Sequence, residues 1–235
     1  MESLYRLIMM LDPMHWLFVL PGILLGLYAQ MKLSSTYGRY IREPVASGLS
    51  GAEAAREILD RAGLSDMPVE EVGGHLTDHY DPRKKALFLS SENYRSRSLA
   101  AVGVAAHEAG HALQHKDAYA PLQLRMMLVP VTQFASYAWI GVMLLGFALG
   151  MAKLVLAAVV IFAILALFQI ITLPVEFNAS SRAKVQLVNL GIVQPQESRA
   201  ISQVLSAAAL TYVAGMIQAV MQLLYFLSLF NRQRD

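Results

Sequence analysis

The sequence contains no cysteine among its 235 residues. Disulfide bonds are therefore excluded, and so are zinc sites built from cysteine thiolates. Any metal ion must instead be held by histidine nitrogens and carboxylate oxygens, and the chain has six histidines that could take part. A net charge of +2, with no basic tract interleaved with aromatic residues, gives no indication of a nucleic-acid partner.

Charged residues are also scarce, at 15% of the chain, whereas hydrophobic residues make up 56%. This apolar share exceeds that of a typical soluble domain and predicts a membrane protein in contact with a lipid bilayer. We interpret the first apolar stretch as a retained span, because it is too long for the apolar region of a signal peptide and lacks a small-residue cleavage site. Four stretches lack Asp, Glu, Lys and Arg over lengths that can cross a bilayer: 13–31, 126–152, 154–175 and 200–230.

Residues 32–125 form the only long polar segment, so they must contain the soluble chemistry. Within it, Ser50 and Glu53 have the spacing of a capping box at the start of an amphipathic helix. The local patterns predict a helix over 54–62, short strands at 69–72 and 85–90, and a further helix over 99–115. We therefore expect a mainly α, polytopic membrane protein with about four transmembrane helices and a small α+β region.

The last of these predicted helices contains a His-Glu-x-x-His motif at 107–111. A spacing of four residues is just over one helical turn, so His107 and His111 project from the same face. Two neutral imidazoles at this spacing suit Zn²⁺, and Glu108 can act as a general base toward an activated water. The alternative is an ordinary helix with polar residues on its solvated side, but a purely structural zinc site would not need Glu108. The motif predicts a zincin-like catalytic region.

The second and third apolar stretches are joined by only a few residues, so they should form a tight hairpin. Two crossings return the chain to the side it left, which places residues after Val175 in the same compartment as the motif. Fifteen of the 19 Lys and Arg residues lie on that side, twelve of them in 32–125 and three in 176–199. The positive-inside rule therefore predicts a cytoplasmic catalytic side, in what we expect to be the bacterial cell (inner) membrane.

A catalytic zinc ion needs a third protein ligand. His115 lies one helical turn too far along to share a metal with His107, and Asp117 occupies the position where a longer zinc motif has histidine. Glu176 is the only carboxylate between Asp117 and Glu197, and it follows the third span on the required side. We predict that His107, His111 and Glu176 bind one Zn²⁺ per chain. The alternative is that Glu176 is an interfacial charge paired with a nearby basic residue, Arg182 or Lys184.

These patterns predict five parts of the chain. They are a lead with the first span (1–31), the catalytic region (32–125), a transmembrane hairpin (126–175), the segment with the third ligand (176–205), and the fourth span with its tail (206–235).

Several stretches resemble the YugP-type membrane-bound neutral zinc metallopeptidases, namely 103–115, 173–180, 78–84 and 50–59, together with the four-span layout. The resemblance implies a zinc-dependent, integral membrane peptidase. More remotely, Glu176 is similar to the third ligand of HtpX-type membrane proteases, which begins a Glu-x-x-Ala-Asp motif. This chain has Ser180 in place of that Asp, a carboxylate expected to orient a zinc-bound histidine. Which group does so here is open between Asn178, Asp117 and Asp81.

A metallopeptidase also gains from a hydrogen-bond donor directed at the oxyanion that forms during the reaction. The candidates for this role, or for supporting the ligands, are His79, Tyr80, Tyr94 and Arg182. The strand predicted at 85–90 lies just before the zinc helix and could bind the substrate backbone as an added strand.

The motif and the resemblance together predict an endopeptidase that cleaves polypeptides near the membrane surface, with membrane or membrane-associated proteins as substrates. A non-catalytic zinc-binding scaffold or sensor is the alternative, against which the intact Glu108 argues. An intramembrane site-2-type protease is a second alternative, but charged residues such as Arg97 and Lys116 bracket the motif and favour a helix at the surface. ATP-driven membrane proteases share a similar motif, but this chain has no phosphate-binding Gly-Lys-Ser/Thr loop.

Overall fold

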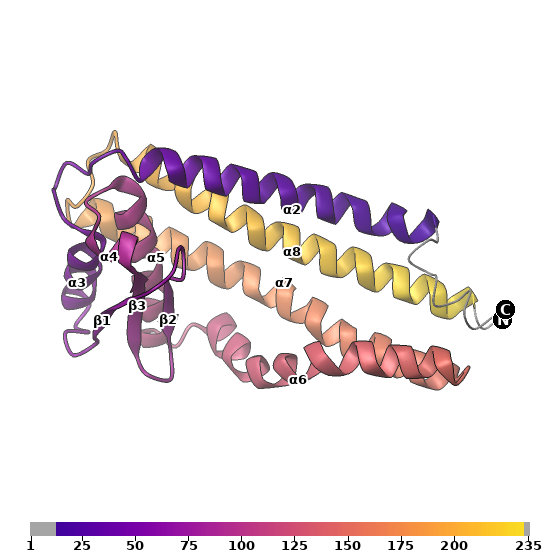
Figure 1. The fold of residues 1–235 in the computed structure, drawn as a ribbon. Helices are drawn as coiled ribbons and strands as arrows, with labels where there is room; N and C mark the ends of the chain where they lie inside the picture. The colour runs from indigo at the N-terminus through magenta and orange to yellow at the C-terminus, as the bar shows by residue number, and fades with distance from the viewer. Residues whose placement is uncertain (1–12, 233–235) are drawn as a thin grey trace. The chain divides into compact units, whose positions relative to one another are not determined.

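The computed structural model describes residues 13–232, which form two compact units. The helical unit comprises residues 13–28, Leu124–Leu173 and 211–232, and the mixed unit comprises Ala29–Gln123 and Pro174–Leu210. Four long helices contribute residues to both units: α2 (Pro13–Tyr40), α6 (Ala120–Ala148), α7 (Ala152–Asn189) and α8 (Ser198–Arg232) (Figure 1).

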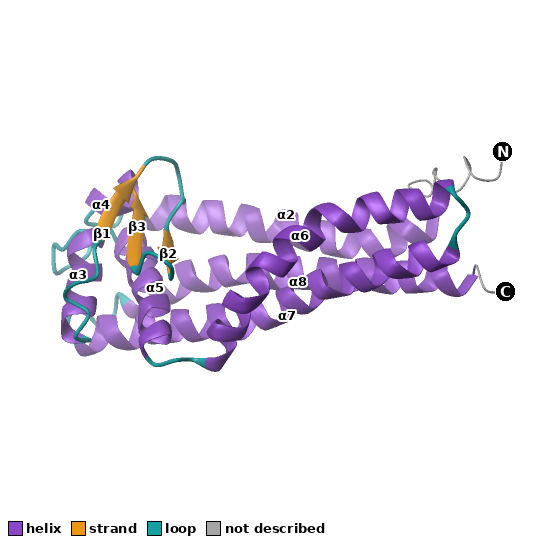
Figure 2. Cartoon of the chain, turned by 90° about the horizontal axis from the view of Figure 1, so that it is seen from below, coloured by secondary structure: helices purple, strands orange, loops and turns teal. Residues whose placement is uncertain are grey.

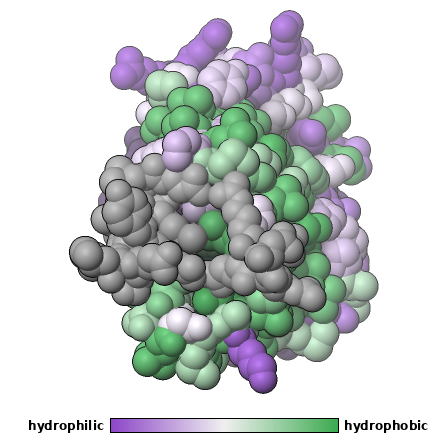
Figure 3. All heavy atoms as spheres, turned by 90° about the vertical axis from the view of Figure 1, so that its right-hand side faces the viewer, coloured by the Kyte–Doolittle hydropathy of each residue, from purple (hydrophilic) through white to green (hydrophobic). Residues whose placement is uncertain are grey.

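Each of these four helices is long and apolar enough to cross a membrane. Many of their large apolar side chains are exposed, among them Leu24 at 60%, Phe134 at 74% and Tyr137 at 82%. Apolar exposure on this scale is expected of surfaces that contact lipid rather than water. Hydrophobic residues also cover much of the described surface on the face drawn in Figure 3. The prediction of a mainly α, polytopic membrane protein with four spans is confirmed.

The core of the helical unit is built by aromatic and aliphatic side chains of α6, α7 and α8. Trp139, Phe162 and Phe226, one from each helix, pack pairwise with ring centroids 5.1 to 5.6 Å apart. The turn between α6 and α7 is short, and Gly150 within it has a φ of +63°, which glycine adopts without strain. The two helices therefore form the tight hairpin that the sequence predicts.

The mixed unit contains a three-stranded sheet of β1 (Val69–Val72), β2 (His79–Asp81) and β3 (Ala86–Ser90), in the order β1-β3-β2 (Figure 2). The central strand, β3, is entirely buried and pairs in parallel with β1 and antiparallel with β2. The two predicted strands are confirmed. The expectation that 85–90 could receive a substrate strand is wrong, however, because β3 is paired on both sides and the sheet edges belong to β1 and β2.

The short strand β2 was not predicted, because its three residues are polar and show no alternation. Its position is set instead by contacts with more distant residues. The Asp78 carboxylate, just before β2, accepts hydrogen bonds from the Ser90 backbone N–H at 2.8 Å and from Asn93 Nδ2 at 2.8 Å. These bonds fix the start of β2 at the end of β3, so that Tyr80 comes to lie opposite Leu87.

Three helices complete the mixed unit: α3 (Gly51–Arg61), α4 (Ser91–Arg95) and α5 (Leu99–Lys116). The predicted capping box is present, since the Ser50 hydroxyl accepts from the Glu53 backbone N–H and the Glu53 carboxylate accepts from the Ser50 backbone N–H. Buried side chains of α3, α5, α7 and α8 form the core. Alanine and glycine dominate the buried faces of α5, so neighbouring helices can approach its backbone closely.

Helix α7 continues past the end of the charge-free stretch. The apolar segment ends at Val175, yet the helix runs unbroken through Pro174 and on to Asn189. A proline in a helix interior removes one backbone hydrogen bond, so other contacts must stabilise this region. Ala179, Ala183 and Leu187, spaced four residues apart on one helical face, are all buried. This buried face extends α7 into the mixed unit, so Glu176 lies within a helix.

Candidate metal centre

Helix α5 presents the motif residues at its buried surface. The helix begins after Ser98, whose hydroxyl accepts a hydrogen bond from the backbone N–H of Ala101. Because α5 is regular, His107 and His111 project from one face, with ring centroids 4.8 Å apart and planes at 81°. His111 and Glu108 are each only 8% exposed. The helix therefore holds two imidazoles and a carboxylate in a setting that is largely shielded from water.

Glu176 of α7 meets the two histidines across the interface between α5 and α7. Its carboxylate oxygen Oε2 lies 3.2 Å from His107 Nε2 and 3.6 Å from His111 Nε2, and the residue is 2% exposed. The three ligand atoms all lie within 4.8 Å of one another. The structure thus brings together the three residues that the sequence predicts as ligands, and the group could hold a metal ion.

The spacing of these donor atoms fits zinc. Protein ligands lie 2.0–2.2 Å from Zn²⁺, so two ligands at tetrahedral positions are about 3.3 Å apart. The distances of 3.2 and 3.6 Å from Glu176 Oε2 to the two histidine nitrogens match that separation. Two imidazole nitrogens and one carboxylate oxygen also form a donor set used by catalytic zinc sites, which keep the fourth position open. The residues present therefore fit the metal.

Glu108 lies next to His107 in the sequence but is not one of the three candidate ligands. Burial raises the pKa of the Glu108 carboxyl to about 7, whereas the neighbouring His107 and a hydrogen bond from the Tyr80 backbone N–H act in the opposite direction. A carboxyl group that titrates near neutrality can both take up and release a proton. The Tyr80 contact also shows that β2 lies alongside the motif face of α5.

The outer ring nitrogens of both histidines have partners. His111 Nδ1 lies 3.0 Å from Gln114 Oε1, and His107 Nδ1 lies 3.1 Å from the Ser180 hydroxyl. Such contacts orient an imidazole so that its other nitrogen faces the metal. Ser180, which stands in the place of the carboxylate of the HtpX-type motif, therefore still contacts a candidate ligand, His107.

The three residues considered for this orienting role have other partners. Asn178 Oδ1 accepts hydrogen bonds from Gln114 and Arg182, and Asp117 forms an ion pair with Arg182. Asp81 accepts from the backbone N–H groups of the turn that follows it. Gln114 belongs to none of the motifs that the sequence reveals. The one feature of the sequence that could draw attention to Gln114 is its position three residues after His111, which places it on the same helical face.

The candidate donors for the reaction occupy different settings. His79 is exposed, stacks on Phe88 with ring centroids 5.0 Å apart, and directs Nδ1 at the Thr77 carbonyl at 2.9 Å. The Tyr80 hydroxyl lies 2.7 Å from Nδ1 of His115, and His115 is one helical turn beyond His111 on α5. Arg182 is engaged by Asn178 and Asp117, and Tyr94 packs against the hydrophobic core. Tyr80 therefore contacts α5 through both its side chain and its backbone.

Gly110 allows α5 and α7 to approach closely at this site. A Cβ atom added at Gly110 would lie 2.5 Å from the carbonyl oxygen of Ala179 and 3.1 Å from its carbonyl carbon. Both atoms belong to the α7 backbone, so no side-chain rotation can relieve the overlap. The glycine of the motif therefore sets the separation between the two helices that carry the candidate ligands.

We expect Gly110→Ala to weaken zinc binding and to destabilise the fold by about 1–3 kcal/mol, as overpacking of a core does. The α7 backbone has to move away from α5, and Glu176 moves with it. Gly38→Ala is the matched control, because nothing lies within 4 Å of a Cβ added there. Thermal unfolding and metal content of the two variants should differ. Equal values for both variants would contradict the proposed close packing.

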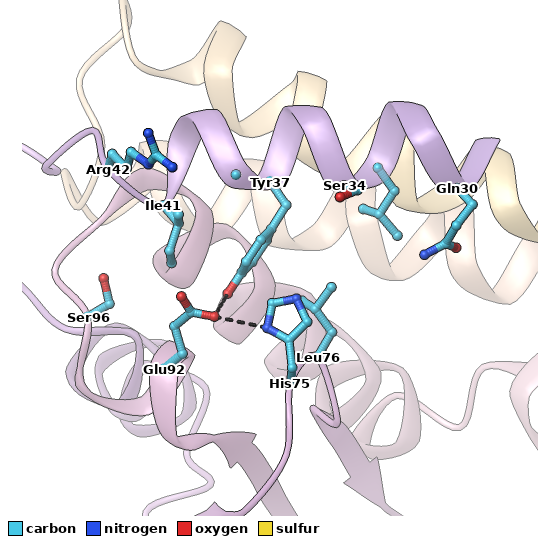
Figure 4. Close-up of a pocket in the computed structure, with 11 residues that line it drawn as sticks. Gln30, Ser34, Tyr37, Ile41, Arg42, His75, Leu76, Glu92 and Ser96 are labelled. Carbon is cyan, nitrogen blue, oxygen red and sulfur yellow. Dashed lines mark hydrogen bonds and ion pairs between the residues drawn. The ribbon is translucent and has the colours of Figure 1, made fainter. Parts of the chain in front are cut away.

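A separate pocket of about 630 Å³ lies in the mixed unit, between one face of α2, the loop before β2, and α4 (Figure 4). The hydroxyl of Tyr37 is 3.0 Å from Glu92 Oε2, and that carboxylate oxygen is 3.1 Å from His75 Nδ1. None of the motif residues, nor Glu176, lines this pocket. It is therefore a different feature of the unit from the metal centre.

Comparison with known proteins gives a consistent result. Residues 15–231 match the protein family described as "Putative neutral zinc metallopeptidase". The chain is also 46% identical over 211 residues to "Putative membrane protease YugP" of Bacillus subtilis (strain 168), covering 90% of this chain and 94% of that protein. No solved structure matches the chain.

Proposed function

This chain belongs to the family described as putative neutral zinc metallopeptidases, and from that premise we propose that it is a zinc-dependent, membrane-embedded endopeptidase. His107, His111 and Glu176 bind one Zn²⁺ per chain, and Glu108 is the catalytic base. The observation that carries the proposal is the convergence of two imidazole nitrogens and a carboxylate oxygen within 4.8 Å, beside a buried glutamate.

Bound zinc supplies the Lewis acidity that activates a water molecule and polarises a peptide carbonyl. Glu108 accepts the proton of the attacking water on its carboxylate and then passes it to the nitrogen of the leaving amine. Glu108 is buried on the side of α5 that contacts β2, and this shielded position keeps bulk water from competing for that proton. The Tyr80 backbone N–H holds the carboxylate in place during both transfers.

The substrate backbone binds along β2. Of the described strands, β1 and β2 form the edges of the sheet, and β2 is the edge strand that contacts Glu108. An extended peptide can add to such an edge through main-chain hydrogen bonds, with little dependence on its sequence. This mode of binding brings a scissile peptide bond close to Glu108.

Membrane or membrane-associated proteins are the proposed substrates. Glu176 directly follows the charge-free stretch 154–175 on the same continuous helix, α7. A ligand in that position keeps the metal near the end of a span, because a zinc–oxygen bond is only about 2 Å long. Loops and juxtamembrane segments of other membrane proteins can reach such a site more readily than soluble chains can.

The test compares one unfolded polypeptide in two forms, fused to a transmembrane span or free in solution, with the purified enzyme in vesicles. We expect the tethered form to be cleaved at least about ten times faster than the free form, because tethering raises its local concentration at the site. A metal chelator should stop cleavage of both forms, and added Zn²⁺ should restore it. Equal rates for the two forms would remove the proposed preference. Zinc binding without cleavage of either form would favour the non-catalytic scaffold or sensor.

We further propose that the protein lies in the bacterial cell membrane with its catalytic side in the cytoplasm. The chain has no cysteine, so single-cysteine variants can report its topology without background labelling. Ser47 and Met151 are both exposed and lie on opposite sides in this arrangement. In intact cells, an impermeant thiol reagent should label Met151→Cys and should label Ser47→Cys only after permeabilisation. The reverse pattern would place the catalytic side outside.

A further inference from the structure

Gln114 is a fully buried amide on α5, with an exposed fraction of 0%. A buried amide is costly unless both its oxygen and its nitrogen form hydrogen bonds. Gln114 satisfies its oxygen through His111 on α5 and its nitrogen by reaching across to α7. Its Nε2 donates to the Val175 carbonyl oxygen at 2.7 Å and to Asn178 Oδ1 at 3.0 Å.

These contacts fix the orientation of the amide. A backbone carbonyl oxygen can only accept hydrogen bonds, so the NH₂ group of Gln114 must be the side that faces Val175. The amide oxygen Oε1 then faces His111 Nδ1, 3.0 Å away. Since Oε1 can only accept, His111 Nδ1 must carry a proton and donate it.

The proton on Nδ1 determines what His111 offers to a metal. A neutral imidazole protonated at Nδ1 has its free lone pair on Nε2, the nitrogen that faces Glu176. Ser180 cannot impose the same choice on His107, because a hydroxyl group both donates and accepts. Gln114 is thus the partner that selects a tautomer within the candidate metal centre.

The same side chain also holds the other half of the site. Val175 directly precedes Glu176, so the bond from Gln114 to the Val175 carbonyl fixes the α7 backbone next to the third candidate ligand. Asn178, the second acceptor, is held in turn by Arg182 Nε at 2.8 Å. Arg182 forms an ion pair with Asp117 at the end of α5, so this network joins the two helices a second time.

We propose that Gln114 is a positioning residue of the metal centre. It holds His111 in the metal-binding tautomer and, through Val175, holds Glu176 at the distance that zinc requires. This inference rests on the proposed function, since it presupposes that His107, His111 and Glu176 bind zinc.

The test measures Zn²⁺ affinity of the full-length chain in detergent, by competition with a chromophoric chelator. Gln114→Met retains the length of the side chain and removes all three hydrogen bonds, so we expect zinc affinity to fall about 10- to 100-fold. Gln114→Glu retains an acceptor for His111 and removes both amide donors, so its affinity should lie between those of Gln114→Met and the wild type. The visible spectrum of bound Co²⁺ should change in both variants.

Gln203→Met is the control for the same substitution at an exposed position of the mixed unit, where it removes one side-chain hydrogen bond, from the Tyr40 hydroxyl. We expect wild-type zinc affinity and an unchanged Co²⁺ spectrum from this control. A merely structural role for Gln114 would lower stability with and without metal alike, and would leave the Co²⁺ spectrum unaltered.

Wild-type zinc affinity in Gln114→Met would overturn the inference, and so would equal weakening in all three variants. If Gln114→Met does not fold, the Gln114→Glu variant tests the inference in its place. Wild-type zinc affinity and a wild-type Co²⁺ spectrum in Gln114→Glu would exclude a role for the amide donors. The proposed function fails separately, if the wild-type chain itself binds no zinc or binds zinc without cleaving polypeptides.

Discussion

We expect the Glu108→Gln variant to lose peptide-bond cleavage by at least about a hundredfold while still binding zinc. Glutamine has nearly the same size and shape as glutamate, but its amide cannot accept the proton of the attacking water. The side chain interacts with His107 and is not one of the three converging donors. Removing a buried, titratable carboxyl also spares the fold the cost of desolvating a charge, so the variant should fold normally.

The matched control for this prediction is Glu70→Gln, which makes the same chemical change at an exposed position on β1. Cleavage rates and zinc content are measured for both variants and the wild type. Full activity in Glu108→Gln at full metal occupancy would show that another group is the base. Loss of zinc from Glu108→Gln would instead show that Glu108 supports the metal directly.

The second large effect is expected at Glu176. Glu176→Gln should lower zinc affinity more than about a hundredfold, which is the upper limit for changes that only affect groups around the ligands. An amide oxygen carries no charge and is a much weaker zinc ligand than a carboxylate. Cleavage should disappear together with the metal, because His107 and His111 alone leave the centre one ligand short.

The metal-free state separates this effect from unfolding. Glutamine has the same length as glutamate and can still accept a hydrogen bond at this buried position, so the metal-free variant should remain folded. Only the added stability that bound zinc gives to the folded wild type should be absent from the variant. Zinc content by elemental analysis and thermal unfolding with and without zinc are the required measurements. If the variant retains zinc at wild-type affinity, then Glu176 is an interfacial charge and the third ligand lies elsewhere.

The sequence predicts those parts of the fold that depend on local patterns. Charge-free stretches reveal the four long helices, the capping box locates the start of α3, and the spacing of His107 and His111 favours a helix. The short strands β1 and β3 are also recognisable, because β1 begins and ends with a β-branched valine and β3 is mostly apolar. In each case the deciding interactions lie within a few residues along the chain.

Features that depend on packing between distant parts of the chain cannot be predicted from such local patterns. The strand β2 forms because β3 provides a partner and Asp78 anchors its start, and neither interaction is visible in three polar residues. β3 has the composition of a strand that could accept a substrate, but its central place in the sheet follows only from the pairing. The continuation of α7 beyond Val175 similarly depends on residues that pack against other helices.

The candidate site shows the same division. His107, Glu108 and His111 form a motif, and Glu176 stands out as the one carboxylate in a long apolar region. Gln114 does not stand out, because its three hydrogen bonds involve both α5 and residues of α7 some sixty positions away. An isolated glutamine in a helix has no recognisable role until the neighbouring helix is in place.

The most direct test of the proposed metal centre is an anomalous diffraction map recorded at the zinc edge from crystals of the purified wild-type protein. We expect one peak per chain, about 2 Å from His107 Nε2, from His111 Nε2 and from a carboxylate oxygen of Glu176. A peak held by a different set of side chains, or no peak in protein that cleaves peptides, would contradict the proposed centre.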